Sequence, residues 1–218
     1  MKKEAMEIHF VNKSLHIDIH NNDLPHWQQN DAVMFLTCRL ADSLPQSKLA
    51  EYRDLIERFD HHFNDMTGQS DDEHRKLQEQ ASERIRQWLD AGMGSCILRS
   101  GKEREIVSDS LKYIDGKKIH TYAYVIMPNH LHILLSPLDS TPITDTFENL
   151  KKFMTRKINK VTGRTDKIWQ KYHFDTLVRS RQDFDETVMY IIQNPKHRPE
   201  SDYTLYVEPE ILEMLREH

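Results

Sequence analysis

The fold is decided by one stretch of the chain, Tyr122-Ala-Tyr-Val-Ile-Met-Pro-Asn-His-Leu-His-Ile-Leu-Leu-Ser136. Its first half is apolar nearly throughout, which predicts a strand from Thr121 to Met127 that is buried on both faces. Pro128 and Asn129 predict a tight turn. The second half, His130 to Leu135, alternates in polarity and predicts a second strand. The stretch is therefore expected to form two paired strands at the centre of the fold.

The second strand carries two histidines on the same face. Side chains of a strand point alternately to opposite faces, so His130 and His132 lie side by side, while Leu131 and Ile133 point into a core on the other face. Two imidazoles on a rigid strand can offer two nitrogens to one metal ion. Taken alone, the pair is more often two strand histidines without a metal.

Composition limits the classes of protein to which the chain can belong. A length of 218 residues fits a single domain over 1–218, and 38% hydrophobic with 30% charged residues is typical of a globular protein. No apolar run is long enough to predict a membrane span, and the N-terminus lacks the apolar core of a signal peptide. Cys38 and Cys96 fit no zinc pattern. We therefore expect a reduced, cytoplasmic protein without contact to a membrane.

The first half of the chain predicts one strand and a pair of helices. Residues 1–31 are expected to form an N-terminal extension, with a small hairpin within 5–20 and a polar linker over 21–31. The strand covers 32–40. Residues 45–92 contain two apolar stripes at helical spacing, separated by a polar break, and predict an inserted helical hairpin that ends at Gly92.

The second half predicts alternating helices and strands. After a short extended piece at 95–99, helices are expected over 102–114, 145–161 and 183–194, a strand over 175–180 and a helical turn within the tail, 200–218. Asp145 and Asp183, each followed by Glu three residues later, are predicted to cap their helices. This order predicts an α+β fold, a ferredoxin-like split βαβ sandwich whose central antiparallel sheet carries the His-x-His strand, with the helical hairpin inserted.

The last helix places a tyrosine and an asparagine on one face. Tyr190 and Asn194 are four residues apart, so they stack beside the apolar stripe of that helix. Together with His130 and His132, Asn194 would provide two nitrogens and one oxygen, a set that suits Mg²⁺ or Mn²⁺ when waters fill the other positions. Tyr190 would lie beside the ion. A half-buried helix tyrosine and an asparagine at a helix end are the ordinary alternatives.

Basic residues are concentrated between 151 and 181. This window contains ten basic and two acidic residues, although the net charge of the chain is -5. The basic side chains of the helix lie mostly off its apolar stripe, and aromatic residues follow, as in proteins that stack single-stranded bases. The candidate DNA-binding residues are Lys151, Lys152, Arg156, Lys160, Trp169 and Arg179. Core packing of Trp169, Tyr172 and Phe174, and a merely solvated helix face, remain open.

Several stretches of the chain resemble the single-tyrosine HUH transposases, particularly the REP-associated tyrosine transposases of bacteria. The similar stretches are Pro25-His-Trp27, Phe35-Leu-Thr-Cys-Arg-Leu-Ala-Asp-Ser-Leu-Pro45, Trp88-Leu-Asp-Ala-Gly-Met-Gly-Ser-Cys96, Met127-Pro-Asn-His-Leu-His132, Trp169-Gln170 and Tyr190-Ile-Ile-Gln-Asn-Pro195. They extend from residue 25 to about 199. The His-Leu-His pair is weak on its own, whereas the complete set in this order is specific.

The resemblance implies a mechanism and a partner. Tyr190 matches the nucleophile of the family, and His130, His132 and Asn194 match the ligands of its divalent cation, Mg²⁺ or Mn²⁺. Such enzymes cut single-stranded DNA with hairpins, leave a 5′-phosphotyrosine and a free 3′-hydroxyl, and later rejoin the strand. Relatives act as monomers or homodimers.

Two other functions stay open. A domesticated relative could bind structured DNA or RNA without cutting it, and each site residue is ordinary when taken singly. A replication or plasmid-mobilisation nickase would use the same chemistry, but such proteins usually order their motifs differently.

Overall fold

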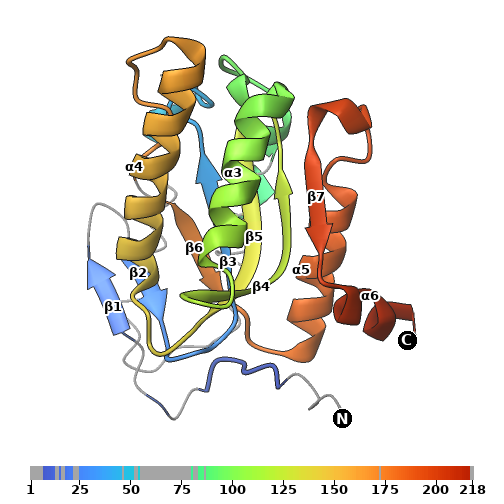
Figure 1. The fold of residues 1–218 in the computed structure, drawn as a ribbon. Coiled ribbons are helices and arrows are strands. Elements are labelled where there is room, and N and C mark those ends of the chain that lie inside the picture. Colours follow the sequence, from blue (N-terminus) through green and yellow to red (C-terminus); the bar gives the residue numbers. More distant parts are fainter. Residues whose placement is uncertain are drawn as a thin grey trace.

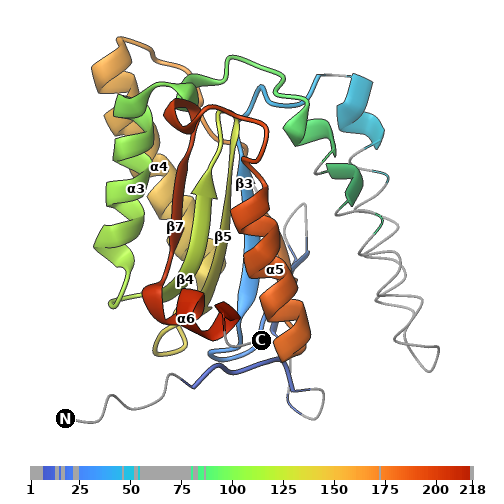
Figure 2. The ribbon, with the colours of Figure 1, turned by 90° about the vertical axis from the view of Figure 1, so that its right-hand side faces the viewer.

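The centre of the fold is a five-stranded antiparallel sheet with helices on both faces (Figures 1 and 2). The computed structural model describes residues 7–12, 15, 18–21, 25–45, 47–51, 54, 80, 83–85, 87–171 and 173–216. The strands lie in the order β6 (Phe174–Leu177), β3 (Met34–Arg39), β5 (His130–Pro137), β4 (Ile119–Ile126) and β7 (Thr204–Val207). The predicted α+β class and the central antiparallel sheet are confirmed.

The helices divide between the two faces of the sheet. Along the chain, α3 (Gly101–Ile114) joins β3 to β4, and α4 (Ile143–Thr162) joins β5 to β6, which is the split βαβ order predicted from the sequence. Figure 2 shows α3 and α4 on one face and α5 (Arg181–Gln193) on the other. No helix within the described residues has the length and apolar character needed to cross a membrane.

Strand β5 separates two hydrophobic cores by its alternation. Leu131 and Ile133 belong to the core beneath α3 and α4, which also buries Phe147 and Met154 of α4. Leu134 belongs to the core beneath α5. All eight residues of β5 are buried, so a change of register by one residue would place the two histidines in the apolar core beneath α3 and α4.

Both predicted acidic helix caps are wrong in position. Helix α4 begins after Pro142, so Asp145 lies inside its first turn. Helix α5 is capped by Ser180, whose hydroxyl accepts a hydrogen bond from the backbone N–H of Asp183 at 3.1 Å. Asp183 in turn accepts from the backbone N–H of Arg179 at 3.3 Å. The acidic residues therefore sit in the first turn, where the positive end of the helix dipole favours them.

Short elements account for the other differences from the prediction. The piece at 95–99 is not extended but forms a 3₁₀ helix, η1 (Ile97–Arg99), entered through left-handed backbone at Cys96. The N-terminal hairpin pairs β1 (Asp18–Asn21) with β2 (Pro25–Gln28), so it lies partly in the predicted linker. The tail contains a strand, β7, which pairs with β4 and forms an edge of the sheet. It lies between η2 (Glu200–Asp202) and α6 (Pro209–Arg216).

The inserted helical hairpin is described only at its base. Residues 47–51 and 87–90 are helical, while most of the predicted hairpin, 45–92, lies outside the described residues. A small cluster at the base packs Trp88 and Leu89 against Phe174 of β6. Gly92 has a φ of +68°, as expected for the residue that ends the second helix.

Candidate active site

His130 and His132 form a buried pair on the face of β5 that α5 covers. Their side chains are 0% and 1% exposed, and their ring centroids are 4.6 Å apart. Since β5 lies in the middle of the sheet, between β3 and β4, the backbone at neither histidine can move without disturbing strand pairing. The strand therefore fixes the two imidazoles relative to each other.

Tyr190 and Asn194 reach this pair from α5. The Tyr190 hydroxyl oxygen lies 2.9 Å from Nε2 of His132, and the side-chain amide of Asn194 donates a hydrogen bond to the same hydroxyl at 2.9 Å. Since Tyr190 Oη accepts from Asn194, its own proton is available to Nε2 of His132. The structure thus joins three of the four predicted site residues in one hydrogen-bonded chain.

Asn129 determines which nitrogen of His130 carries the proton. The Asn129 amide nitrogen donates to the backbone carbonyls of Leu89 at 3.1 Å and Met93 at 3.2 Å, which fixes the orientation of the amide. Its oxygen lies 2.8 Å from Nδ1 of His130 and must accept. His130 is therefore protonated on Nδ1, and its Nε2 retains a lone pair.

Thr37 provides the corresponding contact for His132. Its hydroxyl lies 2.9 Å from Nδ1 of His132, because the two residues are directly opposite in the pairing of β3 with β5. Phe35, two residues earlier on the same face, stacks on the His132 ring with centroids 5.3 Å apart and meets the Tyr190 ring edge-on at 5.9 Å. Both imidazoles thus have a hydrogen bond at Nδ1, and Nε2 of His132 faces Tyr190 of α5.

Burial keeps His130 neutral. Its pKa falls to about 3, chiefly because burial disfavours the charged form and secondly because the positive charge of Arg198 is near. The Arg198 guanidinium donates to the backbone carbonyl of Asp90 at 3.0 Å, which holds it close to the site. A neutral imidazole with a free lone pair is the form that binds a metal ion.

Two buried polar atoms at the site lack a partner within the described part of the chain. They are Nε2 of His130 and Oδ1 of Asn194. An unsatisfied buried polar atom costs about 1–3 kcal/mol, so such an atom calls for a ligand. With Nε2 of His132, these atoms form the two-nitrogen, one-oxygen donor set predicted from the sequence. The chemistry of these residues therefore fits a divalent cation, although no group of three His, Cys, Asp or Glu residues suited to a metal occurs among the described residues.

Sequence reasoning missed the residues that hold the histidines. Thr37 and Phe35 were predicted only as parts of a strand, and their role follows once the register of β3 against β5 is known. Asn129 was predicted only as a turn residue, although it directly precedes His130. No sequence signal could have identified the backbone carbonyls of Leu89 and Met93 as its acceptors.

Two of the predicted DNA-binding residues are buried. Lys151 is 5% exposed, and its ammonium group donates to the backbone carbonyls of Gln170 and Lys171. Trp169 is 2% exposed. Neither belongs to an exposed basic surface, because the segment after α4 folds back over this part of the helix. His173 and Phe174 are buried as well, and Tyr172 lies outside the described residues.

The remaining basic residues are separated from the tyrosine. Lys152, Arg156 and Lys160 are exposed on α4, on the opposite face of the sheet from α5 (Figure 2). Arg179 directly precedes the N-cap of α5, roughly 16 Å from Tyr190 at 1.5 Å per helical residue. The candidate phosphate contacts and the candidate nucleophile thus lie on different parts of the molecule.

Comparison with known proteins relates the chain to transposases. The family model described as Transposase IS200 like matches residues 99–194, which contain the histidine strand, the basic helix and the tyrosine helix. A solved structure described as the REP-associated tyrosine transposase bound to a REP hairpin is 14% identical, with a TM-score of 0.41, and the match covers 78% of this chain and 70% of that one. No curated protein matches. Over residues 99–194, the chain is therefore similar to the IS200-like transposases.

Proposed function

We propose that this chain is a metal-dependent transposase that cuts and rejoins single-stranded DNA at hairpins through a 5′-phosphotyrosine on Tyr190. One observation carries the proposal. Asn194, Tyr190 and His132 form a hydrogen-bonded chain beside two buried atoms that lack partners, Nε2 of His130 and Oδ1 of Asn194. A nucleophile and a cation site therefore share one small region. The hairpin substrate is taken from the resemblance to REP-associated tyrosine transposases.

His130, His132 and Asn194 would hold the cation, Mg²⁺ or Mn²⁺. When bound, the cation supplies a Lewis acid that neutralises charge on the non-bridging oxygens of a phosphodiester. The Asn129 oxygen keeps the proton of His130 on Nδ1, and the Thr37 hydroxyl contacts Nδ1 of His132, so both Nε2 atoms would be available to hold a cation.

Tyr190 carries out the covalent step. Its hydroxyl oxygen attacks phosphorus, a new oxygen–phosphorus bond forms, and the bond from phosphorus to the 3′-oxygen breaks. The tyrosine loses its proton and the departing 3′-oxygen gains one, so no other reactant is needed. In the reverse direction the 3′-hydroxyl attacks the phosphotyrosine and the strand is rejoined.

Asn194 assists Tyr190 in either direction. If Nε2 of His132 held a cation, Tyr190 would give up its hydrogen bond with that nitrogen. Asn194 can bind through Oδ1 and still donate from its amide nitrogen to the phenol oxygen. A hydrogen bond to the charged form lowers the pKa of a phenol, which makes Tyr190 a better nucleophile and a better leaving group.

The test is formation of a covalent adduct. Wild-type protein is mixed with single-stranded hairpin DNA labelled at its 3′ end, the end that stays linked to a 5′-phosphotyrosine, and with Mn²⁺, and the products are separated on a denaturing gel. Wild type should give a labelled protein band, and Tyr190→Phe should give none. Tyr113→Phe, at an exposed tyrosine of α3, is the control and should react as wild type.

Two outcomes would contradict the proposal. One is an adduct that forms equally well with Tyr190→Phe. The other is a wild-type protein that binds the hairpin in the presence of a chelator but never forms an adduct, which would support a non-cleaving DNA- or RNA-binding protein instead.

A further inference from the structure

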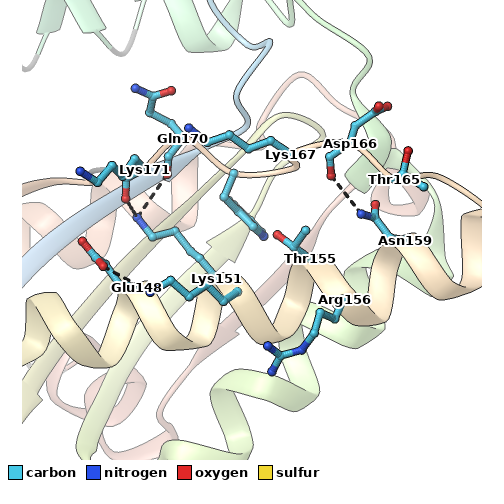
Figure 3. A pocket seen from close by; sticks show the side chains of 12 residues that line it. Glu148, Lys151, Thr155, Arg156, Asn159, Thr165, Asp166, Lys167, Gln170 and Lys171 are labelled. Carbon is cyan, nitrogen blue, oxygen red and sulfur yellow. Dashed lines mark hydrogen bonds and ion pairs between the residues drawn. The ribbon is translucent and has the colours of Figure 1, made fainter.

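A pocket of about 570 Å³ lies between α4 and the segment 165–171 (Figure 3). It lies beside α4, on the face of the sheet opposite to Tyr190, so it is separate from the candidate active site. Its volume is within the range of roughly 300–1,000 Å³ of typical ligand pockets. The pocket is large enough for a small ligand or for one unit of a polymer.

The charge of the pocket is positive. Five lysine and arginine residues line it, against two carboxylates, Glu148 and Asp166. Both carboxylates are neutralised by ion pairs, Glu148 with Lys152 at 3.6 Å and Asp166 with Arg164 at 3.0 Å. Within the part of the chain that the structure describes, Arg156 and Lys167 make no ion pair. An anionic ligand therefore fits this pocket.

Two residues that line the pocket have polar atoms without a partner among the described residues. Nε1 of Trp169 is a buried donor, and Oδ1 of Asn159 is a buried acceptor. The amide nitrogen of Asn159 donates to the backbone carbonyl of Asp166 at 3.0 Å, which fixes the orientation of the amide and leaves its oxygen without a partner (Figure 3). Each unsatisfied atom costs about 1–3 kcal/mol. A ligand with a neighbouring acceptor and donor would recover this cost.

Lys151 shapes the pocket before any ligand arrives. Its ammonium group donates to the backbone carbonyls of Gln170 and Lys171, so it ties the wall formed by the segment to the wall formed by α4 (Figure 3). Burial lowers the pKa of Lys151, and the nearby charge of Lys167 lowers it further. A wall that is already in place reduces the ordering cost of binding.

We infer that this pocket binds one unpaired nucleotide of the DNA substrate. The base bonds to the Trp169 N–H and the Asn159 oxygen, and its phosphate contacts Arg156 and Lys167. Every nucleobase carries a donor and an acceptor on its edge, and every nucleotide carries an anion, so this ligand meets both requirements. The identity of the polymer as DNA rests on the proposed function. Tyr190 and the pocket then engage different positions of the same strand.

The first experiment measures binding separately from cleavage. The protein carries Tyr190→Phe, and fluorescence anisotropy gives its affinity for hairpin DNAs with an abasic site at each unpaired position in turn. At one of these positions, the abasic site should lower the affinity of the protein for the DNA between roughly fivefold and one hundredfold, the equivalent of about 1–3 kcal/mol. Adding Trp169→Phe should lower affinity for intact DNA by a similar factor and should have little further effect at that abasic position.

A second pair of variants tests the phosphate contacts. Arg156→Gln and Lys167→Gln should each reduce the slope of log affinity against log salt by about one. Lys157→Gln, one residue further along α4 and outside the pocket, removes the same charge and should leave the slope nearly unchanged. If Trp169→Phe fails to fold, Asn159→Ala on the helix surface replaces it in the abasic experiment.

The inference is overturned if no abasic position is coupled to Trp169 or Asn159, or if Arg156→Gln behaves like Lys157→Gln. Its failure is distinct from failure of the proposed function. A wild-type protein that forms no adduct, yet shows the abasic coupling, would contradict the transposase chemistry and leave the nucleotide pocket standing. An adduct that forms although no abasic position is coupled to Trp169 or Asn159 would support the transposase chemistry and contradict the nucleotide pocket.

Discussion

The candidate active site and the candidate nucleotide pocket, between α4 and residues 165–171, both contain buried polar atoms without partners among the described residues, but they are built differently. In the active site, β5 and α5 place the side chains, and the nitrogen of each imidazole that faces away from α5 is held by a further hydrogen bond. In the pocket, one wall is a helix and the other is a connecting segment tied down by Lys151. Forming a covalent bond requires side chains that are placed by a strand and a helix and held by further hydrogen bonds. Binding a nucleotide would tolerate a wall made of a connecting segment. The following predictions test that difference.

The largest effect is expected from the loss of an imidazole. His130→Ala should lower Mn²⁺-dependent adduct formation roughly a thousandfold, because it removes a candidate ligand of the cation and the several kcal/mol that the cation contributes. His120→Ala is the control, since His120 lies on β4 and pairs with Glu208 at 3.0 Å. Equal rates for the two variants would refute the role of His130.

A smaller loss is expected at the residue behind the ligand. Asn129→Ala should weaken Mn²⁺ binding about 10- to 100-fold, as is usual when the hydrogen-bond partner of a ligating histidine is removed. Electron paramagnetic resonance of free Mn²⁺ measures the affinity without reference to activity. Asn159→Ala in the pocket should leave it unchanged, and an equal loss in both variants would erase the distinction between the two regions.

In the pocket, the predicted effect is a loss of protein stability. Lys151→Met should lower the free energy of unfolding by about 1–3 kcal/mol, because two backbone carbonyls lose their donor. Lys152→Met, next along the helix and exposed, should change it by less than about 0.5 kcal/mol. Urea titration measures both, and equal stabilities would show that Lys151 does not hold the wall.

The last prediction concerns the dependence of stability on pH. In the metal-free protein, the pKa of His130 is lowered to about 3, whereas the unfolded chain has an ordinary histidine. The unfolded state therefore binds more protons between pH 6.5 and 3, and stability should fall as the pH falls through this window, by up to about 1.4 kcal/mol per pH unit. Denaturation in a chelator should show a shallower dependence for His130→Asn. An unchanged slope would mean that His130 does not titrate as its burial implies.

Regular periodicity allowed most of the fold and the centre of the site to be predicted. Alternation along β5 placed His130 and His132 on one face, and the four-residue spacing on α5 placed Tyr190 above Asn194. These patterns follow from local geometry, which every strand or helix shares. Short elements were missed because they have no such pattern. Strand β7 is four residues long, half-exposed at the sheet edge, and gains its structure only by pairing with β4.

The basic surface shows where a helical pattern stops being informative. Periodicity placed Lys151 off the apolar stripe of α4, which is correct for the helix in isolation. The segment that follows the helix then covers that side, so Lys151 and Trp169 are buried. A helical wheel gives the direction of a side chain but not what a later part of the chain lays over it.

The amide of Asn129 has a consequence for regulation. It links the proton state of His130 to the carbonyls of Leu89 and Met93, at the base of the inserted helices. Thermodynamic coupling is reciprocal, so any partner that shifts this base would change the affinity for the cation, and the cation would stabilise the base by the same free energy. Slower amide hydrogen exchange at residues 89–94 on addition of Mn²⁺ would measure this coupling. Residues 89–94 then offer a position at which another molecule could change the affinity of the candidate site for a cation.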